Sequence, residues 1–556
     1  MHSNLHQLES LFQEGTQHFH AGRFSEAYQA YIRCNDIRPV TADILNALGL
    51  SAFMLKRFEL SVHWFEALLR LAPDNAEARL NLGSALFELS QFEAALACYD
   101  SVVASEPQNA QAWYNRGVAL RQLKQLDEAQ ASYLRAIALN PDYPEAYSNL
   151  GVVHHERGEH QQALDCYNRA HTLKPDYAEA YSNAGATFMA LADYEASLKS
   201  YEAALLHNAA LPSACWNKGI LLLLKGNLEQ GLPLYEWRFH HQRQALFRRP
   251  LTLQSPRLTS TDRVAGKTVF IYDEQGLGDT IQMARYVTLL AQRGARVVLR
   301  AAQELHGLFK NLEGMQQLLG DFDDIPEHDF QCPMMSLPLA CGTTADTIPA
   351  AIPYLYAPPD KVRHFAQLLV AERARQKDQQ PKVQQAQHPA HETSSGQLTP
   401  DAVIGLVWAG NPRNPTDARR SIRLSELISH LPPGPLYVAM QRDVSEQDRA
   451  LLASRNDILD LSLHLKDFAD TAALCMCVTR MVCVDTSVAH LAGALGVPTD
   501  LMISCVPDWR WMLQREDTPW YPTVSLLRQP TPGDWSTVLK RLKISLETAY
   551  LSPVLS

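Results

Sequence analysis

The chain has 556 residues, of which 46% are hydrophobic and 20% charged, and its formal net charge is −10. This length predicts several domains, each able to bury its own core. The composition excludes a wholly disordered chain. The acidic balance argues against a nucleic-acid-binding protein, which usually carries a strongly basic surface.

The first residues, MHSNLHQLESLFQEG, lack the apolar core of a signal peptide. The longest apolar run, residues 220–224, is far too short to span a bilayer. Of the ten cysteines, Cys475 and Cys477 are the closest pair; their spacing does not suit zinc, but alternate positions would share one side of a strand. We therefore expect a cytoplasmic protein with reduced thiols and no transmembrane segment.

Three kinds of residue recur with a period of 34 in the first half of the chain. The glycines are Gly15, Gly49, Gly83, Gly117, Gly151, Gly185 and Gly219; the aromatics are Tyr31, Phe65, Tyr99, Tyr133, Tyr167, Tyr201 and Tyr235; the prolines are Pro39, Pro73, Pro107, Pro141 and Pro175. We expect the glycine to allow two helices to cross closely and the aromatic to pack into the neighbouring helix pair. The proline then starts the next unit.

This pattern resembles the tetratricopeptide repeat, with about seven units over residues 8–245. The resemblance implies an α-solenoid of stacked helical hairpins with a concave inner face. An asparagine also recurs every 34 residues on the expected first helix of five units: Asn81, Asn115, Asn149, Asn183 and Asn217. Asparagine is a mediocre helix former, so its repetition needs a reason.

Two interpretations of these asparagines are open. Their amides could pair with the backbone of an extended peptide in the groove, whatever the peptide's side chains are. Alternatively, each amide could tie one helix to the next. Residues 146–176, AYSNLGVVHHERGEHQQALDCYNRAHTLKPD, resemble the repeats of the eukaryotic O-GlcNAc transferase, which implies that the asparagines hold a protein substrate.

After about residue 262 the pattern changes to strands alternating with helices, which predicts parallel α/β sheets. Residues 267–272 and 295–300 are expected strands around a helix at 280–293, in a first domain over 262–370. Residues 373–400 are rich in Gln, Pro, His and Ser and predict a flexible linker. A second α/β domain over 401–545 contains expected strands at 403–408, 436–440 and 481–485, with a helix from Ser487.

Segments with special chemistry follow several of these strands. The dinucleotide fingerprint fails in DEQGLGDTIQMARY (273–286), because Ile281 stands where the third glycine belongs, and no phosphate loop is present. DTSVAH (485–490) is the better phosphate site, because a helix would begin there with free N–H groups beside Thr486 and Ser487. The competing interpretation is that either hydroxyl only caps the helix.

DEQGLGDTIQMARY, WAGNPRNPTDARRS (408–421) and DTSVAHLAGALGVP (485–498) together resemble glycosyltransferases of the two-Rossmann GT-B type, above all the heptosyltransferases of glycosyltransferase family 9. The resemblance covers about residues 265–545. It implies a metal-independent enzyme without a cofactor, whose nucleotide-sugar donor binds the second domain. The donor-binding residues that it implies are Asn411, Arg420, Ser421, Gln441, Asp485, Thr486, Ser487, Val488 and His490.

Arg420 is the best match to the family's diphosphate-binding base, although it could instead be a surface charge like Arg419 and Arg423. Family members carry an acid near position 441, so Gln441 puts the nucleoside contacts in doubt. Gly276 and Gly278 would form the acceptor loop, and Asp279 matches the family's proposed general base. A carboxylate facing a diphosphate suits such a displacement, but Asp279 could equally cap the helix that follows.

Two further features are expected to be structural. Asp321, Phe322 and Asp323 could pass for a metal-binding D-x-D motif, but their acidic loop predicts solvated charge. Residues 506–523 concentrate Trp509, Trp511, Trp520 and Tyr521, for which packing is the favoured role. Trp509 or Arg510 at the edge of the donor pocket is the lesser alternative.

The leading functional hypothesis is a glycosyltransferase that modifies a protein held by the repeat groove. One alternative is transfer to a glycan or lipopolysaccharide core, although no membrane-docking face is evident. The other is a non-catalytic repeat scaffold, which the short first α/β domain and Gln441 would favour.

Overall fold

The structure is a computed structural model that describes residues 2–38, 41–240, 251, 253–379, 402–411 and 417–550. It divides into two compact units, Met1–Ala214 and Cys215–Ser556. The repeats were expected to end near residue 245. The seventh helix pair, however, groups with the α/β part of the chain rather than with the preceding pairs.

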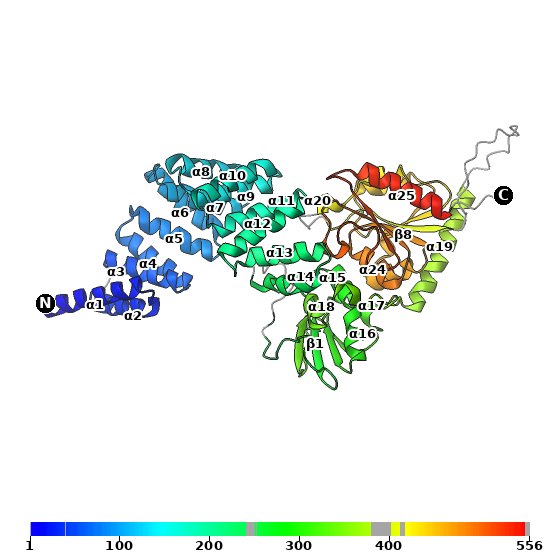
Figure 1. Cartoon of the computed structure of the whole chain (residues 1–556), viewed down its shortest axis with the longest axis horizontal. Coiled ribbons are helices and arrows are strands. Elements are labelled where there is room, and N and C mark those ends of the chain that lie inside the picture. The colour runs from blue at the N-terminus through cyan, green and yellow to red at the C-terminus, as the bar shows by residue number, and fades with distance from the viewer. Residues whose placement is uncertain are drawn as a thin grey trace. The chain divides into compact units, whose positions relative to one another are not determined.

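The described residues contain fourteen consecutive helices in seven pairs (Figure 1). The first helices are α1 (His2–His20), α3 (Ala42–Met54), α5 (Ala76–Glu88), α7 (Ala110–Gln122), α9 (Pro144–Glu156), α11 (Ala178–Ala190) and α13 (Pro212–Leu224). Their partners are α2 (Phe24–Ile37), α4 (Phe58–Leu71), α6 (Phe92–Ser105), α8 (Leu126–Leu139), α10 (His160–Leu173), α12 (Tyr194–His207) and α14 (Leu228–Tyr235).

The periodic glycines lie where the two helices of a pair cross. On each of the first six, an added Cβ would lie 2.6–2.7 Å from a ring carbon of the periodic aromatic residue. The ring therefore packs on the glycine of its own pair. It also clusters with buried residues of the next pair, as expected; Tyr133, for example, packs with Leu150 and Val153 of α9. Pro73, Pro107, Pro141 and Pro175 each follow the end of a second helix by two residues, as the period predicts.

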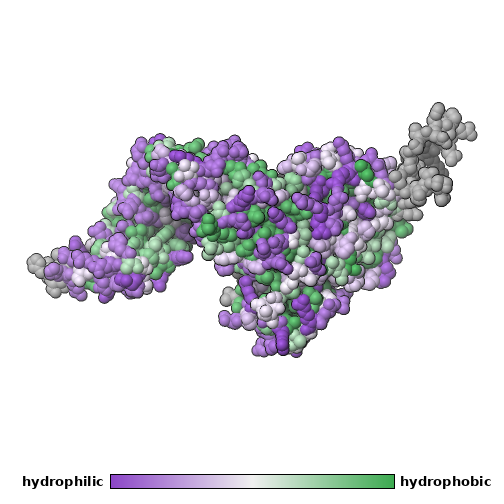
Figure 2. Space-filling view, in the orientation of Figure 1, coloured by the Kyte–Doolittle hydropathy of each residue, from purple (hydrophilic) through white to green (hydrophobic). Residues whose placement is uncertain are grey.

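Successive pairs in the first unit stack on one another, and first helices contact first helices: α3 with α5, α5 with α7, α7 with α9 and α9 with α11. The periodic asparagines on these helices therefore lie along one side of the stack. On the face drawn in Figure 2, the helices present mainly hydrophilic residues, interrupted by small hydrophobic areas.

The first α/β sheet is parallel and four-stranded in the described residues, with the order β3-β2-β1-β4. Its strands are β1 (Thr268–Tyr272), β2 (Arg296–Arg300), β3 (Met315–Leu319) and β4 (Phe330–Pro333), and its helices are α15 (Leu277–Met283), α16 (Arg285–Gln292), α17 (Gln303–Phe309) and α18 (Leu337–Ala340). The single helix expected at 280–293 is broken at Ala284. At the break, side chains take the main-chain carbonyls: Arg285 donates to Gln282 O and Tyr354 to Ile281 O.

The second sheet is parallel and six-stranded in the described residues, with the order β10-β9-β8-β5-β6-β7. Its strands are β5 (Val403–Val407), β6 (Leu436–Ala439), β7 (Ile458–Asp460), β8 (Arg480–Val484), β9 (Thr499–Ile503) and β10 (Val524–Arg528). Its helices are α20 (Asp417–Arg420), α21 (Leu424–Ile428), α22 (Glu446–Ala453), α23 (Phe468–Cys475), α24 (Ser487–Leu495) and α25 (Trp535–Tyr550). Counted along the chain, the order is 6-5-4-1-2-3, the doubly wound arrangement of dinucleotide-binding domains.

Two local features differ from what the sequence predicts. Helix α19 (Pro359–Gln379) continues through the first seven residues of the predicted 373–400 linker; the rest of that linker lies outside the described residues. Cys475 ends helix α23 and Cys477 follows it in a turn, so the two do not belong to a strand. None of the ten cysteines forms a disulfide, and all ten lie in the described residues. Within the residues described, we find no helix long and apolar enough to cross a membrane.

Candidate functional site

The order of the second sheet reverses between β5 and β8. The chain leaves these adjacent strands in opposite directions, which opens a crevice at their carboxyl ends. Residues 409–411 after β5 and 485–487 after β8 border this crevice, and residues 276–279 of the first sheet's domain face it across a cavity of about 540 Å³. The predicted residues that line the cavity are Gly276, Gly278, Asp279, Asn411, Arg420, Gln441, Asp485, Thr486, Ser487, Val488 and His490.

The N-terminus of α24 faces this cavity without a side-chain cap. Thr486 occupies the N-cap position with extended backbone, but its side chain makes no capping hydrogen bond. Its Oγ1 is buried without a hydrogen-bond partner among the described residues. Thr486 therefore occupies the N-cap position but does not cap the helix with its side chain. The positive end of the helix dipole faces the cavity.

Ser421 supports the cavity wall from behind. Its hydroxyl accepts a hydrogen bond from Gly410 N–H (3.0 Å) and donates to Asp417 (2.9 Å), whose other oxygen pairs with Arg420 Nε at 3.2 Å. A Cβ at Gly410 would lie 2.7 Å from the Arg420 guanidinium, so glycine leaves room for that side chain. Arg420 reaches the cavity from this network, whereas Ser421 is not among the residues that line it.

Gln441 joins the ends of two strands. Its Oε1 accepts a hydrogen bond from Ala409 N–H at 3.2 Å, and the side chain is buried. A carboxylate could accept this bond equally well. The amide differs in keeping an N–H₂ donor at a position where an acid would offer only acceptors.

Asp279 uses both carboxylate oxygens. Its Oδ2 accepts a hydrogen bond from Gly276 N–H (2.8 Å), and Gly276 is the N-cap residue of α15, in which Asp279 is the third residue. Its Oδ1 forms an ion pair with Arg510 Nη2 at 2.5 Å. Burial raises the pKa of Asp279, while Arg510 opposes the rise. The interpretation of Asp279 as the N-cap residue is thus wrong, because α15 begins earlier than expected; Asp279 instead reaches back to the N-cap residue, and its role as general base stays a prediction.

Arg510 lines the cavity, as the lesser alternative for residues 506–523 allowed, although it was not among the predicted donor-binding residues. The residue is 4% exposed. Its guanidinium bridges Asp279 and Asp508, with Nη1 2.6 Å from Asp508, while Nε donates to Gln282 Oε1 at 2.7 Å. The sequence signal for it was a single arginine between Trp509 and Trp511. The aromatics of this segment are buried, as expected for packing.

His490, in the first two turns of α24, and Asp485, just before this helix, also line the cavity. Burial, followed by nearby arginines, lowers the pKa of His490 well below its ordinary value, so the imidazole is neutral; its Nδ1 lies 3.0 Å from the Tyr521 hydroxyl and its ring stacks on Trp511. Burial, with Asp508, raises the pKa of Asp485 to about 6. A Cβ on Gly278 would lie 2.9 Å from the His490 ring, so this glycine allows the two domains to meet.

The periodic asparagines make contacts between helices. Asn149 donates to the Tyr114 hydroxyl (2.9 Å) and Asn183 to Ser148 Oγ (3.3 Å), in each case on the first helix of the preceding pair. Asn115 accepts from Gln111 of its own helix. The helix-tying interpretation therefore has direct contacts at two positions. All five side chains, including Asn81 and Asn217, are partly exposed, and their binding of a peptide stays a prediction.

The suspected D-x-D segment forms a turn. Asp323 accepts a hydrogen bond from Gly320 N–H at 2.7 Å, and Phe322 is 91% exposed. In the described part of the chain, no group of three or more His, Cys, Asp or Glu side chains is arranged to hold a metal ion.

Comparisons with known proteins concern the helical repeats. Residues 117–158 match a family described as TPR repeat, and residues 12–76, 80–129 and 144–177 match families described as tetratricopeptide repeat. The helix pairs in these ranges are therefore tetratricopeptide repeats, a module that binds protein partners.

One curated relative is protein FlbA of Caulobacter vibrioides, 28% identical over 158 residues, or 27% of this chain. The chain spans about a quarter of that relative's length, 26%. Among solved structures, the MamA protein is 26% identical, with 30% of this chain and 92% of that chain covered and a TM-score of 0.27. A tetratricopeptide repeat protein from Parabacteroides merdae is 15% identical, with coverages of 43% and 96% and a TM-score of 0.40.

Proposed function

We propose that this chain is a metal-independent glycosyltransferase that moves a sugar from a nucleotide-sugar donor to a protein held by its tetratricopeptide repeats. Its two parallel-sheet domains would form a GT-B fold related to the heptosyltransferases. The observation that carries the proposal is the uncapped N-terminus of α24 at the reversal point of the second sheet, open to a cavity of about 540 Å³.

The electrostatics of this cavity support binding of a diphosphate. A helix N-terminus attracts an anion through its N–H groups and its dipole. Arg420 and Arg510 line the same cavity and could neutralise the charge that develops on a departing nucleoside diphosphate. Asp417 pairs with Arg420 in the space that Gly410 leaves, which limits the reorganisation needed when an anion arrives.

The proposed chemistry gives Asp279 a conditional role. In the structure its Oδ1 is engaged by Arg510. A diphosphate that drew Arg510 away would leave that oxygen able to accept the proton of an acceptor hydroxyl. If Arg510 kept the carboxylate, Asp279 would remain a structural residue, which is the arrangement expected of the non-catalytic scaffold.

The test is a thermal-shift panel of UDP, GDP, ADP and CMP sugars on the full chain. We expect one donor to raise the melting temperature, because a ligand that binds only the folded protein stabilises it. Arg420→Ala should abolish this shift. Arg419→Ala is the matched control, since Arg419 is exposed and is not among the cavity-lining residues. A panel without any shift would refute donor binding and favour the scaffold.

A further inference from the structure

Tyr235 departs from the packing of the aromatic residues in its register. In the six preceding pairs the ring covers the periodic glycine, whereas a Cβ on Gly219 would instead meet the backbone of α14, 2.8 Å from Tyr235 N. The cause lies in the seventh pair itself. The preceding second helices have 14 residues, but α14 has 8 and contains Pro233, which removes a hydrogen-bond donor within the helix.

The ring of Tyr235 is used in the α/β part of the unit. Its hydroxyl accepts a hydrogen bond from Gln275 Nε2 at 3.0 Å, and its ring centroid lies 6.0 Å from that of Trp509. The side chain is buried. Gln275 immediately precedes Gly276, whose N–H donates to Asp279. Trp509 immediately precedes Arg510. Tyr235 therefore contacts both segments that present the Asp279–Arg510 ion pair to the cavity.

A buried network fixes the end of the seventh pair to the first sheet. Arg238, in the 3-10 turn η1 (Glu236–His240), donates to both oxygens of Glu274 at 3.1 and 2.9 Å. Glu274 follows β1 and also accepts from Met335 N–H, just after the adjacent strand β4. The network thus occupies the point where the order of the first sheet reverses between β1 and β4.

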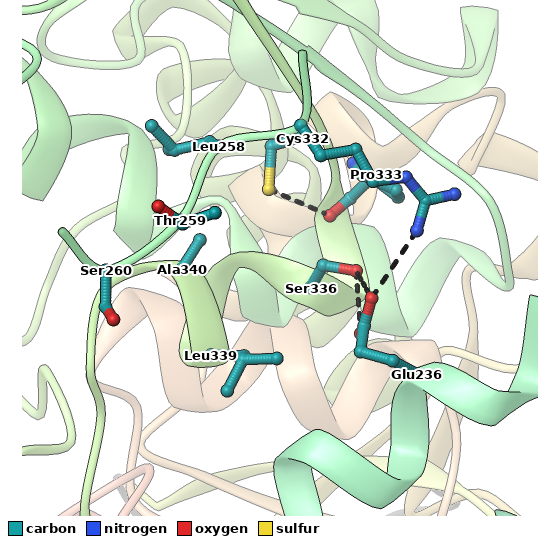
Figure 3. A pocket seen from close by; sticks show the side chains of 10 residues that line it. Glu236, Leu258, Thr259, Ser260, Cys332, Pro333, Ser336, Leu339 and Ala340 are labelled. Atoms are coloured by element: carbon teal, nitrogen blue, oxygen red, sulfur yellow. Dashed lines mark hydrogen bonds and ion pairs between the residues drawn. The ribbon is translucent and has the colours of Figure 1, made fainter. Parts of the chain in front are cut away.

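Ser336 and Glu236 complete this attachment (Figure 3). Ser336 Oγ lies 2.6 Å from Arg238 Nη2 and donates to Glu236 at 2.8 Å. In Figure 3 the Glu236 carboxylate points at Ser336, beside a small cavity of about 140 Å³. Arg238 also donates to the main-chain oxygen of Tyr235 at 3.3 Å and lies 4.8 Å from the centroid of its ring, so this buried network holds one side of Tyr235.

We propose that the seventh helix pair is a positioning element of the cleft, in which Tyr235 sets the placement of the segments that carry Asp279 and Arg510. The inference rests on the proposed function for the use of that ion pair. The positioning itself can be measured without any substrate. Tyr235 is thus a positioning residue, because it acts through Gln275 and Trp509.

The test is hydrogen–deuterium exchange on the full chain. Tyr235→Phe removes only the hydrogen bond to Gln275, and Tyr235→Leu also removes the ring contact with Trp509. We expect backbone exchange in residues 273–283 and 506–512 to become about threefold to tenfold faster in Tyr235→Phe, and faster still in Tyr235→Leu. The matched control is Tyr133→Phe, at the same register position on α8, outside the unit that holds both monitored segments.

Unchanged exchange in both segments in Tyr235→Phe and Tyr235→Leu would overturn the proposal. Equally fast exchange throughout residues 215–550 would overturn it too, because that pattern means a loss of general stability. Donor binding in the thermal-shift panel is a separate readout, so a failure of the proposed function can be told apart from a failure of the positioning proposal. If a donor is found, Tyr235→Phe should lower kcat with little change in the donor KM.

Discussion

At the residue scale, the buried carboxylate of Asp485 lowers the stability of the folded protein when it is ionised. Its carboxyl group lies at the carboxyl end of β8, beside Asp508 and the N-terminus of α24. Burial, followed by Asp508, raises its pKa to about 6, against the influence of Arg420 and Arg510. Strongly shifted groups gather at functional sites, where charge serves a ligand rather than stability.

This shift predicts a pH dependence. Because the folded-state pKa of Asp485 is above its ordinary value, the folded protein holds the proton more tightly than the unfolded chain. The unfavourable contribution of the carboxylate to the free energy of unfolding therefore grows as pH rises from about 4 to 6 and is complete above 6. Asp485→Asn should melt at a higher temperature than the wild type at pH 7.5, and the difference should shrink toward pH 4.5.

The control for this prediction is Asp443→Asn, an exposed residue that also lines the cavity. Melting curves of both variants between pH 4.5 and 7.5 would decide the matter. A difference for Asp485→Asn that is constant across this range would show that the charge is not the cause.

At the scale of elements, helix α15 follows a strand of the first sheet and helix α24 follows a strand of the second. The two helices contact each other at their N-terminal ends. Gly278 makes the approach possible: an added Cβ would lie 2.9 Å from His490 Cδ2 and 3.2 Å from Ser487 Cα. Neither neighbour can yield easily, because one is backbone and the other is a ring stacked on Trp511. Gly276, two residues earlier, faces only the end of the Asp279 side chain at 3.2 Å.

Gly278→Ala should therefore lower the free energy of unfolding of the C-terminal unit by about 1–3 kcal/mol, the usual cost of overpacking. Gly276→Ala is the control and should have little effect, because its φ of −72° suits any residue. Chemical unfolding of the full chain, followed by tryptophan fluorescence, measures both. Equal stability of the two variants would contradict the close approach.

At the scale of the whole molecule, the last helix pair of the repeats belongs to the α/β unit and not to the preceding repeats. The seventh helix pair belongs to the unit Cys215–Ser556, and its Arg238 neutralises the buried Glu274. A fragment that begins at residue 262 would leave Glu274 buried without its partner, which costs several kcal/mol. It would also uncover Trp509, which Tyr235 contacts.

We therefore expect a fragment of residues 212–556 to be folded and a fragment of residues 262–556 to be unfolded or protease-sensitive. Circular dichroism melting and limited proteolysis of the two fragments test this. A cooperative transition of equal midpoint in both would show that the seventh pair is dispensable for folding.

Much of the fold was predictable because its signals are local or periodic. The glycine and aromatic registers place the helix pairs, and the strands β1, β2, β5, β6 and β8 lie within one or two residues of the expected ranges. The residues expected to share a site do line one cavity, apart from Ser421, because they follow strands whose carboxyl ends meet. Their proposed roles stay predictions.

Other features depend on contacts between distant segments. Arg510 lies 231 positions after Asp279 in the chain, and the local sequence of neither segment predicts the ion pair between them. The break at Ala284 arises because Arg285 and Tyr354 take helix carbonyls, the second from 70 residues away. The helical state of Cys475 was missed because a short apolar run suits a buried helix as well as a strand.

The sequence by itself determined the repeated helix pairs, the alternation of strands and helices, and the residues that follow the key strands, since each depends on neighbours a few positions away. Only the tertiary structure decided that Tyr235 turns from its glycine to Gln275 and Trp509, and that Arg510 engages Asp279. Both outcomes are set by packing between segments far apart in the chain, where burial and charge pairing outweigh the local pattern.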